Sequence, residues 1–185
     1  MENMEKLGQV YLTSGKVVVA DPCYGRECVK NTNNATIVEL RQGMYEAYCS
    51  RSDDNRISAL CIIPAMMDIE DVCYGDYELG VAGVDSGTCG IFCNDYHKKT
   101  HAKEHALDDW YNEFIIADDC PESGITDDSG VFTSSGYGDG CYPVFAVTDR
   151  HGNQFGVLVE FIYEGWEDED DEYYEDDEDE DEDEN

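Results

Sequence analysis

The sequence predicts a mainly β (α+β) fold, in which an antiparallel sheet or sandwich carries one main covering helix and a disordered acidic C-terminal tail. Three observations lead to this fold class. Short β-branched and aromatic runs recur between Gly, Asp, Asn and Pro, which is typical of strands and turns. One segment alone has the apolar period of a helix. The last 19 residues are almost all acidic. We therefore expect one globular domain over residues 1–166 and a disordered tail over residues 167–185.

Nine segments have the composition of strands: Gln9–Thr13, Lys16–Ala20, Thr36–Leu40, Met44–Cys49, Ile57–Ile63, Tyr77–Val84, Thr88–Phe92, Tyr142–Thr148 and Phe155–Tyr163. Ser14-Gly15 and Gln42-Gly43 are turn signals, so we expect hairpins around them. We expect the strand that begins at Thr88 to extend the sheet containing the strand before it. The last two strands flank Asp149–Asn153, whose Asp, Gly and Asn are typical of a hairpin turn.

The one predicted helix covers Lys103–Ala117. Its apolar stripe repeats every three to four residues, at Ala106, Trp110, Phe114 and Ala117. Pro121 ends the helix, and residues 122–130 are rich enough in Gly, Asp and Ser to predict a loop.

Charge and composition exclude several classes of function. The chain has 44 acidic and 11 basic residues, a formal net charge of −33. Nucleic-acid binding needs clustered Lys and Arg, so we expect no nucleic-acid partner. No apolar run approaches the ~20 residues that span a bilayer, so we expect no membrane partner. The expected partners are an unknown small molecule or a basic protein, bound by salt-sensitive attraction.

Cysteine usage indicates a reducing compartment. The nine cysteines are odd in number and form no CxxC pair, and the N-terminus lacks the pattern of a signal peptide. We therefore expect a cytoplasmic protein with free thiols.

Three turn-rich segments each hold an aspartate among glycines: Ala20–Gly25, Val84–Gly90 and Ser134–Pro143. We hypothesise that these loops converge and form one binding surface. Its residues would be three aspartates and three neighbouring tyrosines: Asp21, Tyr24, Asp85, Tyr137, Asp139 and Tyr142. Three converging carboxylates could instead hold Ca²⁺ or Mg²⁺, or supply a general acid and base. In the simplest alternative, each Asp caps its own turn.

These motifs also carry a family resemblance. The strings SGKVVVADPCY, VDSG and SSGYGDGCY resemble those of an uncharacterised domain-of-unknown-function family of small gut-bacterial and phage proteins. The resemblance covers roughly Leu12 to Phe161 and omits the tail. It implies no activity or cofactor. An accessory role in phage–host interaction rests on this resemblance alone.

A line of Cys and His side chains recurs every four residues: Cys89, Cys93, His97, His101 and His105. Two such imidazoles could bind Zn²⁺, but neighbouring lysines would repel a cation. We expect solvent-exposed histidines and assign no metal site.

A non-enzymatic binding or interaction module is the leading functional interpretation. One alternative is a small hydrolase or transferase that uses either an Asp pair as general acid and base or Cys89 as nucleophile. The other is an acidic charge mimic that binds a basic protein. The sequence points to no particular cofactor.

Overall fold

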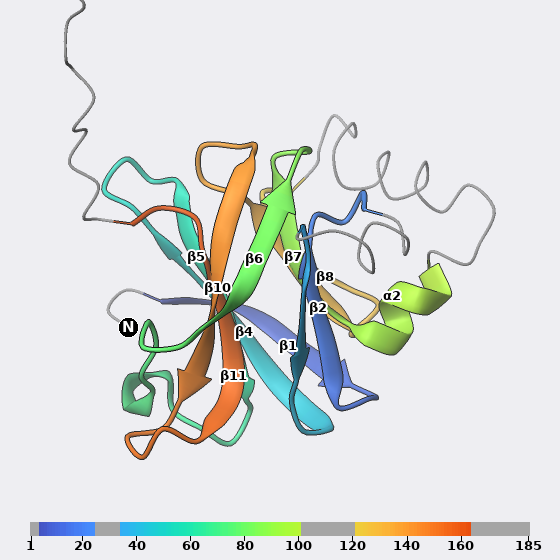
Figure 1. Cartoon of the computed structure of the whole chain (residues 1–185), viewed down its shortest axis with the longest axis vertical. Helices are drawn as coiled ribbons and strands as arrows, with labels where there is room; N and C mark the ends of the chain where they lie inside the picture. Colours follow the sequence, from blue (N-terminus) through green and yellow to red (C-terminus); the bar gives the residue numbers. More distant parts are fainter. Residues whose placement is uncertain (1–3, 25–33, 101–120, 164–185) are drawn as a thin grey trace, which may run out of the picture.

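Two antiparallel sheets face each other and enclose the core (Figure 1). The structure is a computed structural model that describes residues 4–24, 34–100 and 121–163. One sheet has the order β1-β4-β5-β11-β10-β6 and the other β3-β2-β7-β9-β8. The strands are β1 (Glu5–Leu12), β2 (Lys16–Ala20), β3 (Thr36–Glu39), β4 (Gly43–Arg51), β5 (Ile57–Pro64), β6 (Glu78–Val84), β7 (Thr88–Cys93), β8 (Ser123–Thr126), β9 (Gly130–Ser134), β10 (Gly140–Thr148) and β11 (Gln154–Glu160). The predicted mainly β class is confirmed.

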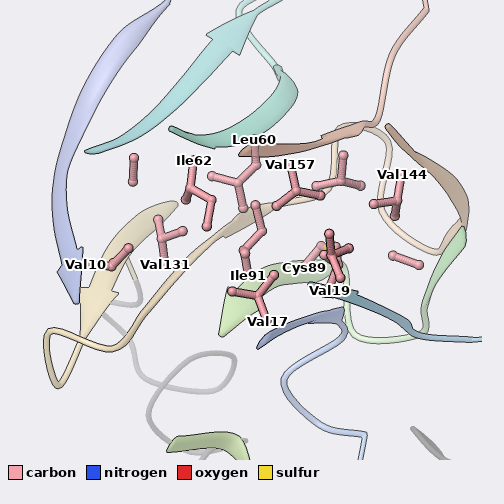
Figure 2. Close-up of a cluster of buried hydrophobic side chains, with 14 of the residues drawn as sticks. Val10, Val17, Val19, Leu60, Ile62, Cys89, Ile91, Val131, Val144 and Val157 are labelled. Atoms are coloured by element: carbon pink, nitrogen blue, oxygen red, sulfur yellow. The ribbon is translucent and has the colours of Figure 1, made fainter. Parts of the chain in front are cut away.

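The core lies between the sheets because successive residues of a strand face opposite sides. Figure 2 shows Leu60 and Val157 of the six-stranded sheet opposite Val19 and Ile91 of the five-stranded sheet. All four side chains are at most 1% exposed. Burying one such side chain contributes about 1.5–3 kcal/mol, so this layer is the main source of stability.

The first four strands form one long ribbon that bends across both sheets. Leu12 pairs with Gly43 and Lys16 with Glu39, so each strand advances four residues and the register is unchanged. At the bend, the N–H of Leu40 donates to the carbonyl of Gly15 at 3.0 Å. The predicted hairpins around Ser14-Gly15 and Gln42-Gly43 are therefore wrong: β1 pairs with β4, and β2 pairs with β3.

A second ribbon bends in the same way but with unequal strands. Val84 of β6 pairs with Gly140 of β10, and Thr88 of β7 pairs with Ser134 of β9. Between these pairs one strand advances four residues and the other six, so two residues are extra at the corner. β7 belongs to the opposite sheet from β6, which corrects the expectation that it extends the same one.

Residues 123–134 form the hairpin β8–β9, so the loop predicted over 122–130 is wrong. Asp127 and Asp128 both have positive φ, the requirement of a tight primed turn. The glycines that suggested a loop make room for aromatic rings. A Cβ on Gly130 would lie 2.4 Å from Phe92, and a Cβ on Gly124 would lie 3.0 Å from Phe132.

Two shorter elements cover the outer faces. The helix α2 (Asn94–Thr100) brings Tyr96 against Phe92 and Phe132 outside the five-stranded sheet (Figure 1). The 3₁₀ turn η1 (Ile69–Asp71) covers part of the outer face of the other sheet. The helix predicted over Lys103–Ala117 and the tail over 167–185 lie outside the described residues. Among those that are described, no helix is long and apolar enough to cross a membrane.

The hairpin β10–β11 is confirmed as predicted, with Val144 opposite Val159. In its loop, one carboxylate oxygen of Asp149 accepts the N–H groups of His151 at 2.8 Å and Asn153 at 3.0 Å. The loop of this hairpin follows the end of β10, at the other end of that strand from the β9–β10 corner.

Replacing Thr133 with Val should stabilise the protein. Thr133 is fully buried in β9, and within the described part of the chain its hydroxyl has no hydrogen-bond partner. Removing a buried unsatisfied hydroxyl at nearly constant volume should raise the free energy of unfolding by about 1 kcal/mol, measured by urea denaturation.

Thr36→Val is the matched control, because the buried Thr36 hydroxyl donates to the carbonyl of Val81 at 2.8 Å. Losing that bond should lower the free energy of unfolding by about 1 kcal/mol. Equal effects from the two substitutions would contradict the hydrogen-bond assignment.

Candidate functional site

Three loops that are far apart in sequence lie at one end of the sandwich. They are the segment after β2, the turn between β6 and β7, and the connection from β9 to β10 (Figure 1). They hold Asp21, Asp85 and Asp139, respectively. Because Val84 pairs with Gly140 in an antiparallel ladder, Asp85 and Asp139 each lie one residue beyond that pair, just outside the adjacent ends of β6 and β10.

The carboxylate of Asp21 joins two of these loops. Asp21 is fully buried, because β2 ends in the interior and Pro22 holds the chain extended there. One oxygen accepts the N–H of Cys23 at 2.7 Å, a turn that the Asp closes on itself. The other accepts the N–H groups of Asp85 and Ser86 at 2.9 and 2.8 Å. Asp21 therefore caps its own turn and also holds the β6–β7 turn in place.

Asp85 is exposed, and its carboxylate accepts a hydrogen bond from the Tyr24 hydroxyl at 2.6 Å. Burial raises the pKa of Tyr24, and the negative charge of Asp85 raises it further. Tyr24 therefore stays protonated and keeps donating at physiological pH. The pair links the first loop to the second on the outer side of Asp21.

The third loop contains the two extra residues of the β9–β10 corner. Its glycines Gly136 and Gly138 have φ values of 62° and 109°, which allow the chain to fold back on itself. The Tyr142 hydroxyl donates to the carbonyls of Ser135 at 2.9 Å and Gly138 at 2.7 Å. Burial raises the pKa of Tyr142, so this hydroxyl remains a donor. The loop is thereby tied to the strand that follows it.

Tyr137 and Asp139 project from this loop into solvent. Tyr137 is 68% exposed, and the guanidinium of Arg56 lies 4.8 Å from its ring centroid, a cation–π contact. Arg56 also donates to the carboxylate of Asp54 at 3.0 Å, which fixes its position. The ring is therefore held from one side by a residue of the loop between β4 and β5.

A pocket of about 540 Å³ opens beside this loop, where β10 begins and β11 ends. That volume is typical of a small-molecule site. Its lining is Tyr137, Asp139, Gly140, Cys141, Tyr142, Pro143, Glu160, Phe161, Ile162 and Tyr163. The lining thus combines three tyrosines with two carboxylates and contains no basic residue.

The six predicted site residues occupy this end in three ways. Tyr137, Asp139 and Tyr142 line the pocket. Tyr24 and Asp85 form the pair on the neighbouring loops, and Asp21 lies buried with its carboxylate engaged by backbone amides. Binding by these residues stays a prediction.

Sequence reasoning missed Glu160, Tyr163 and Arg56, which contribute to the pocket or to its rim. Glu160 ends an apolar strand and Arg56 precedes one, so neither stood in a recognisable motif. Burial raises the pKa of Glu160, because its carboxylate is partly removed from water. The signal available in the sequence was a charged residue, Glu160, at the end of an otherwise apolar run.

The cysteine and histidine line does not form a metal centre within the described ranges, where no group of three or more His, Cys, Asp or Glu could hold an ion. The expected exposure of His97 is wrong: it is 1% exposed and its ring centroid lies 6.3 Å from that of Phe92. His101 and His105 lie outside the described residues. Cys89 is fully buried, and burial together with the charge of Asp21 raises its pKa.

Cys93 lies at the other end of β7 from Cys89, and its surroundings favour ionisation of the thiol, whereas those of Cys89 disfavour it. Burial opposes its ionisation, but the Thr13 hydroxyl at 3.3 Å, the Ser14 hydroxyl at 3.7 Å and nearby backbone N–H groups stabilise the thiolate. The net effect lowers the pKa of Cys93 from 9.0 to about 7. By contrast, burial raises the pKa of Cys23 to about 12, and the charge of Asp21 adds to this.

Asp21→Asn should destabilise the protein by about 2–3 kcal/mol, because the new amide group would face backbone donors and the charge-assisted bonds would be lost. Urea denaturation at pH 7 measures this effect. Asp149→Asn is the control: Asp149 also accepts backbone N–H groups, but its loop is open to water, so its effect should be much smaller. Similar losses for both variants would contradict the special role of Asp21.

The thiolate of Cys93 should make stability depend on pH. Its folded pKa is below the unfolded value, so the contribution is present above pH 9 and is lost as the pH falls through about 7. The free energy of unfolding of the wild type minus that of Cys93→Ser should therefore grow as the pH rises from 7 to 9. The other thiols are common to both proteins and cancel. A difference that stays constant or shrinks would refute the lowered pKa.

Comparison with curated proteins and with solved structures gives no match. A family model, described as Protein of unknown function (DUF4241), matches residues 10–159. The matched region runs from β1 into β11 and includes all three aspartate loops, but it ends just before Glu160. Since the match covers most of the 185 residues, the chain belongs to this family of proteins of unknown function.

Proposed function

We propose that this protein is a non-enzymatic binding module whose recognition site is the pocket at the β9–β10 corner. The observation that carries the proposal is the corner itself, where two extra residues expose Tyr137 and Asp139 beside a cavity of about 540 Å³. Concave sites with aromatic walls and a few convergent polar groups are the usual form of small-ligand and side-chain pockets.

Rigid support around the pocket favours binding. The Tyr142 hydroxyl is held by two carbonyls, and its ring meets Phe161 edge-on at a centroid distance of 5.2 Å. The N–H of Ser135 donates to the carbonyl of Gly87 at 3.0 Å, which joins the corner to the β6–β7 turn. The carboxylate of Asp21 holds the β6–β7 turn by accepting the N–H groups of Asp85 and Ser86. A preorganised wall lowers the entropy cost of taking up a ligand.

The enzymatic alternative has weaker support. A nucleophilic thiol needs access and a lowered pKa, whereas Cys89 is fully buried with its pKa raised. An Asp pair for acid–base work needs two available carboxylates, but backbone amides already engage Asp21.

The proposal also covers the cellular location of the protein, the charge of its partner and its biological role. The described cysteines are all free thiols, which supports a reducing, cytoplasmic location. The charge of −33 supports a basic partner, so an acidic charge mimic remains the second candidate. An accessory role in phage–host interaction is a further part of the proposal and rests on sequence resemblance alone.

A fragment screen tests the binding site. We expect protein-observed NMR with neutral, anionic and cationic fragments to give hits whose shift changes cluster on the pocket lining. Cys141→Trp should abolish these hits, because Cys141 is exposed and lines the pocket, where an indole would fill the space. Cys73→Trp is the matched control, since Cys73 is also exposed but lies outside the lining.

Hits that map elsewhere, or that survive in Cys141→Trp, would refute the proposed site. Turnover of a fragment that Asp139→Asn abolishes would instead establish the enzymatic alternative.

A further inference from the structure

The charges that line the pocket define the chemistry of its ligand. Two carboxylates, Asp139 and Glu160, belong to the lining, and none of its residues is Lys or Arg. Within the described part of the chain, neither carboxylate takes part in an ion pair. Asp139 is exposed, whereas Glu160 is partly buried and burial raises its pKa. A partly desolvated carboxylate without a cation is unfavourable, and a cationic ligand would offset that cost.

The aromatic walls restrict the class of cation further. Tyr137, Tyr142 and Tyr163 line the pocket, and Tyr137 and Tyr163 are 68% and 61% exposed. Ring faces attract cations, and a planar guanidinium both stacks on aromatic rings and pairs with carboxylates through two hydrogen bonds. An ammonium group is more strongly hydrated and makes neither the stack nor the paired bonds.

The protein already holds one guanidinium on this aromatic rim. Arg56 lies over the ring of Tyr137 with its carbon 4.8 Å from the centroid. The same group donates to the carboxylate of Asp54 at 3.0 Å and to the carbonyl of Gly136 at 3.4 Å. Tyr137 therefore has the environment of a guanidinium-binding ring on one side, while the pocket lies beside it.

We infer that the pocket binds an alkylguanidinium cation, the group of an arginine side chain, through Asp139, Glu160 and the tyrosine rings. The inference rests on the proposed function and names the ligand class for the same site. The pocket has a volume of about 540 Å³, which is ample for one arginine side chain. The acidic surface of the chain, with net charge −33, would also attract a basic partner over distance.

Titration with a pair of capped peptides tests the inference. The peptides are Gly-Gly-Arg-Gly-Gly and the same sequence with citrulline, which keeps the shape of arginine but carries no charge. In calorimetry at low salt and pH 7, we expect the arginine peptide to bind at least about tenfold more tightly, since a hydrogen bond between charged groups contributes about 1.5–3 kcal/mol. It should also protect the Cys141 thiol in the lining from alkylation, measured by mass spectrometry.

Three variants localise the binding. Glu160→Gln should weaken the arginine peptide about tenfold and Asp139→Asn about threefold, because Asp139 is more exposed and better screened. Asp149→Asn is the matched control, because Asp149 is a loop carboxylate at the opposite end of β10. This substitution should leave the affinity for the arginine peptide unchanged. Thermal unfolding of each variant checks that it is folded.

A second arm identifies the source of the cation. Free propylguanidinium that binds as tightly as the peptide would support a small-molecule ligand, and tighter peptide binding would support an arginine in a protein partner. Equal binding of the citrulline peptide, or no effect of Glu160→Gln and Asp139→Asn together, would overturn the inference. If fragments still bound the pocket, the proposed function would stand; if nothing bound there, both would fail.

Discussion

The buried carboxylate of Asp21 is the interaction on which the functional end of the molecule depends. A charge removed from water must be compensated, and here three backbone N–H groups from two loops provide the compensation. This requirement fixes the β6–β7 turn against the end of β2. With the turn fixed, Asp85 meets the hydroxyl of Tyr24, and Gly87 presents its carbonyl to Ser135. The arrangement of these loops relative to one another therefore depends on the buried carboxylate of Asp21.

The corners of the sandwich explain why the candidate site lies where it does. A ribbon that passes from one sheet to the other must interrupt its ladder, and residues at the interruption are free to project. The β1–β2 bend keeps its register and projects nothing extra, whereas the β9–β10 corner carries two additional residues. Irregularities of this kind commonly redirect side chains toward function. Tyr137 and Asp139 are the side chains redirected here.

Electrostatics distinguishes two kinds of acidic group in this protein. Among the described residues, Glu39 is an exposed carboxylate paired with Lys16 at 2.8 Å, and exposed pairs of this kind contribute little. Glu160 differs because it is partly buried in a pocket whose lining contains no basic residue. The contrast between Cys89 and Cys93 has a related origin. At Cys89, complete burial and the charge of Asp21 outweigh one backbone donor and disfavour the thiolate, whereas at Cys93 hydroxyl and backbone donors outweigh partial burial and favour it. Burial and the immediate neighbours of each group, more than the net charge of the chain, decide these ionisations.

The sequence by itself determined the strand composition, the strongly acidic character and the β10–β11 hairpin, because these depend on local preferences. It also located the aspartate loops, since Gly, Pro and Asp mark turns wherever they occur. How the other strands pair was decided only by the tertiary structure. The turn signals at Ser14-Gly15 and Gln42-Gly43 are bends of one ribbon, and nothing local distinguishes a bend from a hairpin. The glycines of β8 and β9 likewise reflect the rings that pack on them, and Glu160 and Arg56 gained their positions from contacts across the fold. Pairing and pocket formation depend on residues distant in the chain, and that is why local patterns could not reveal them.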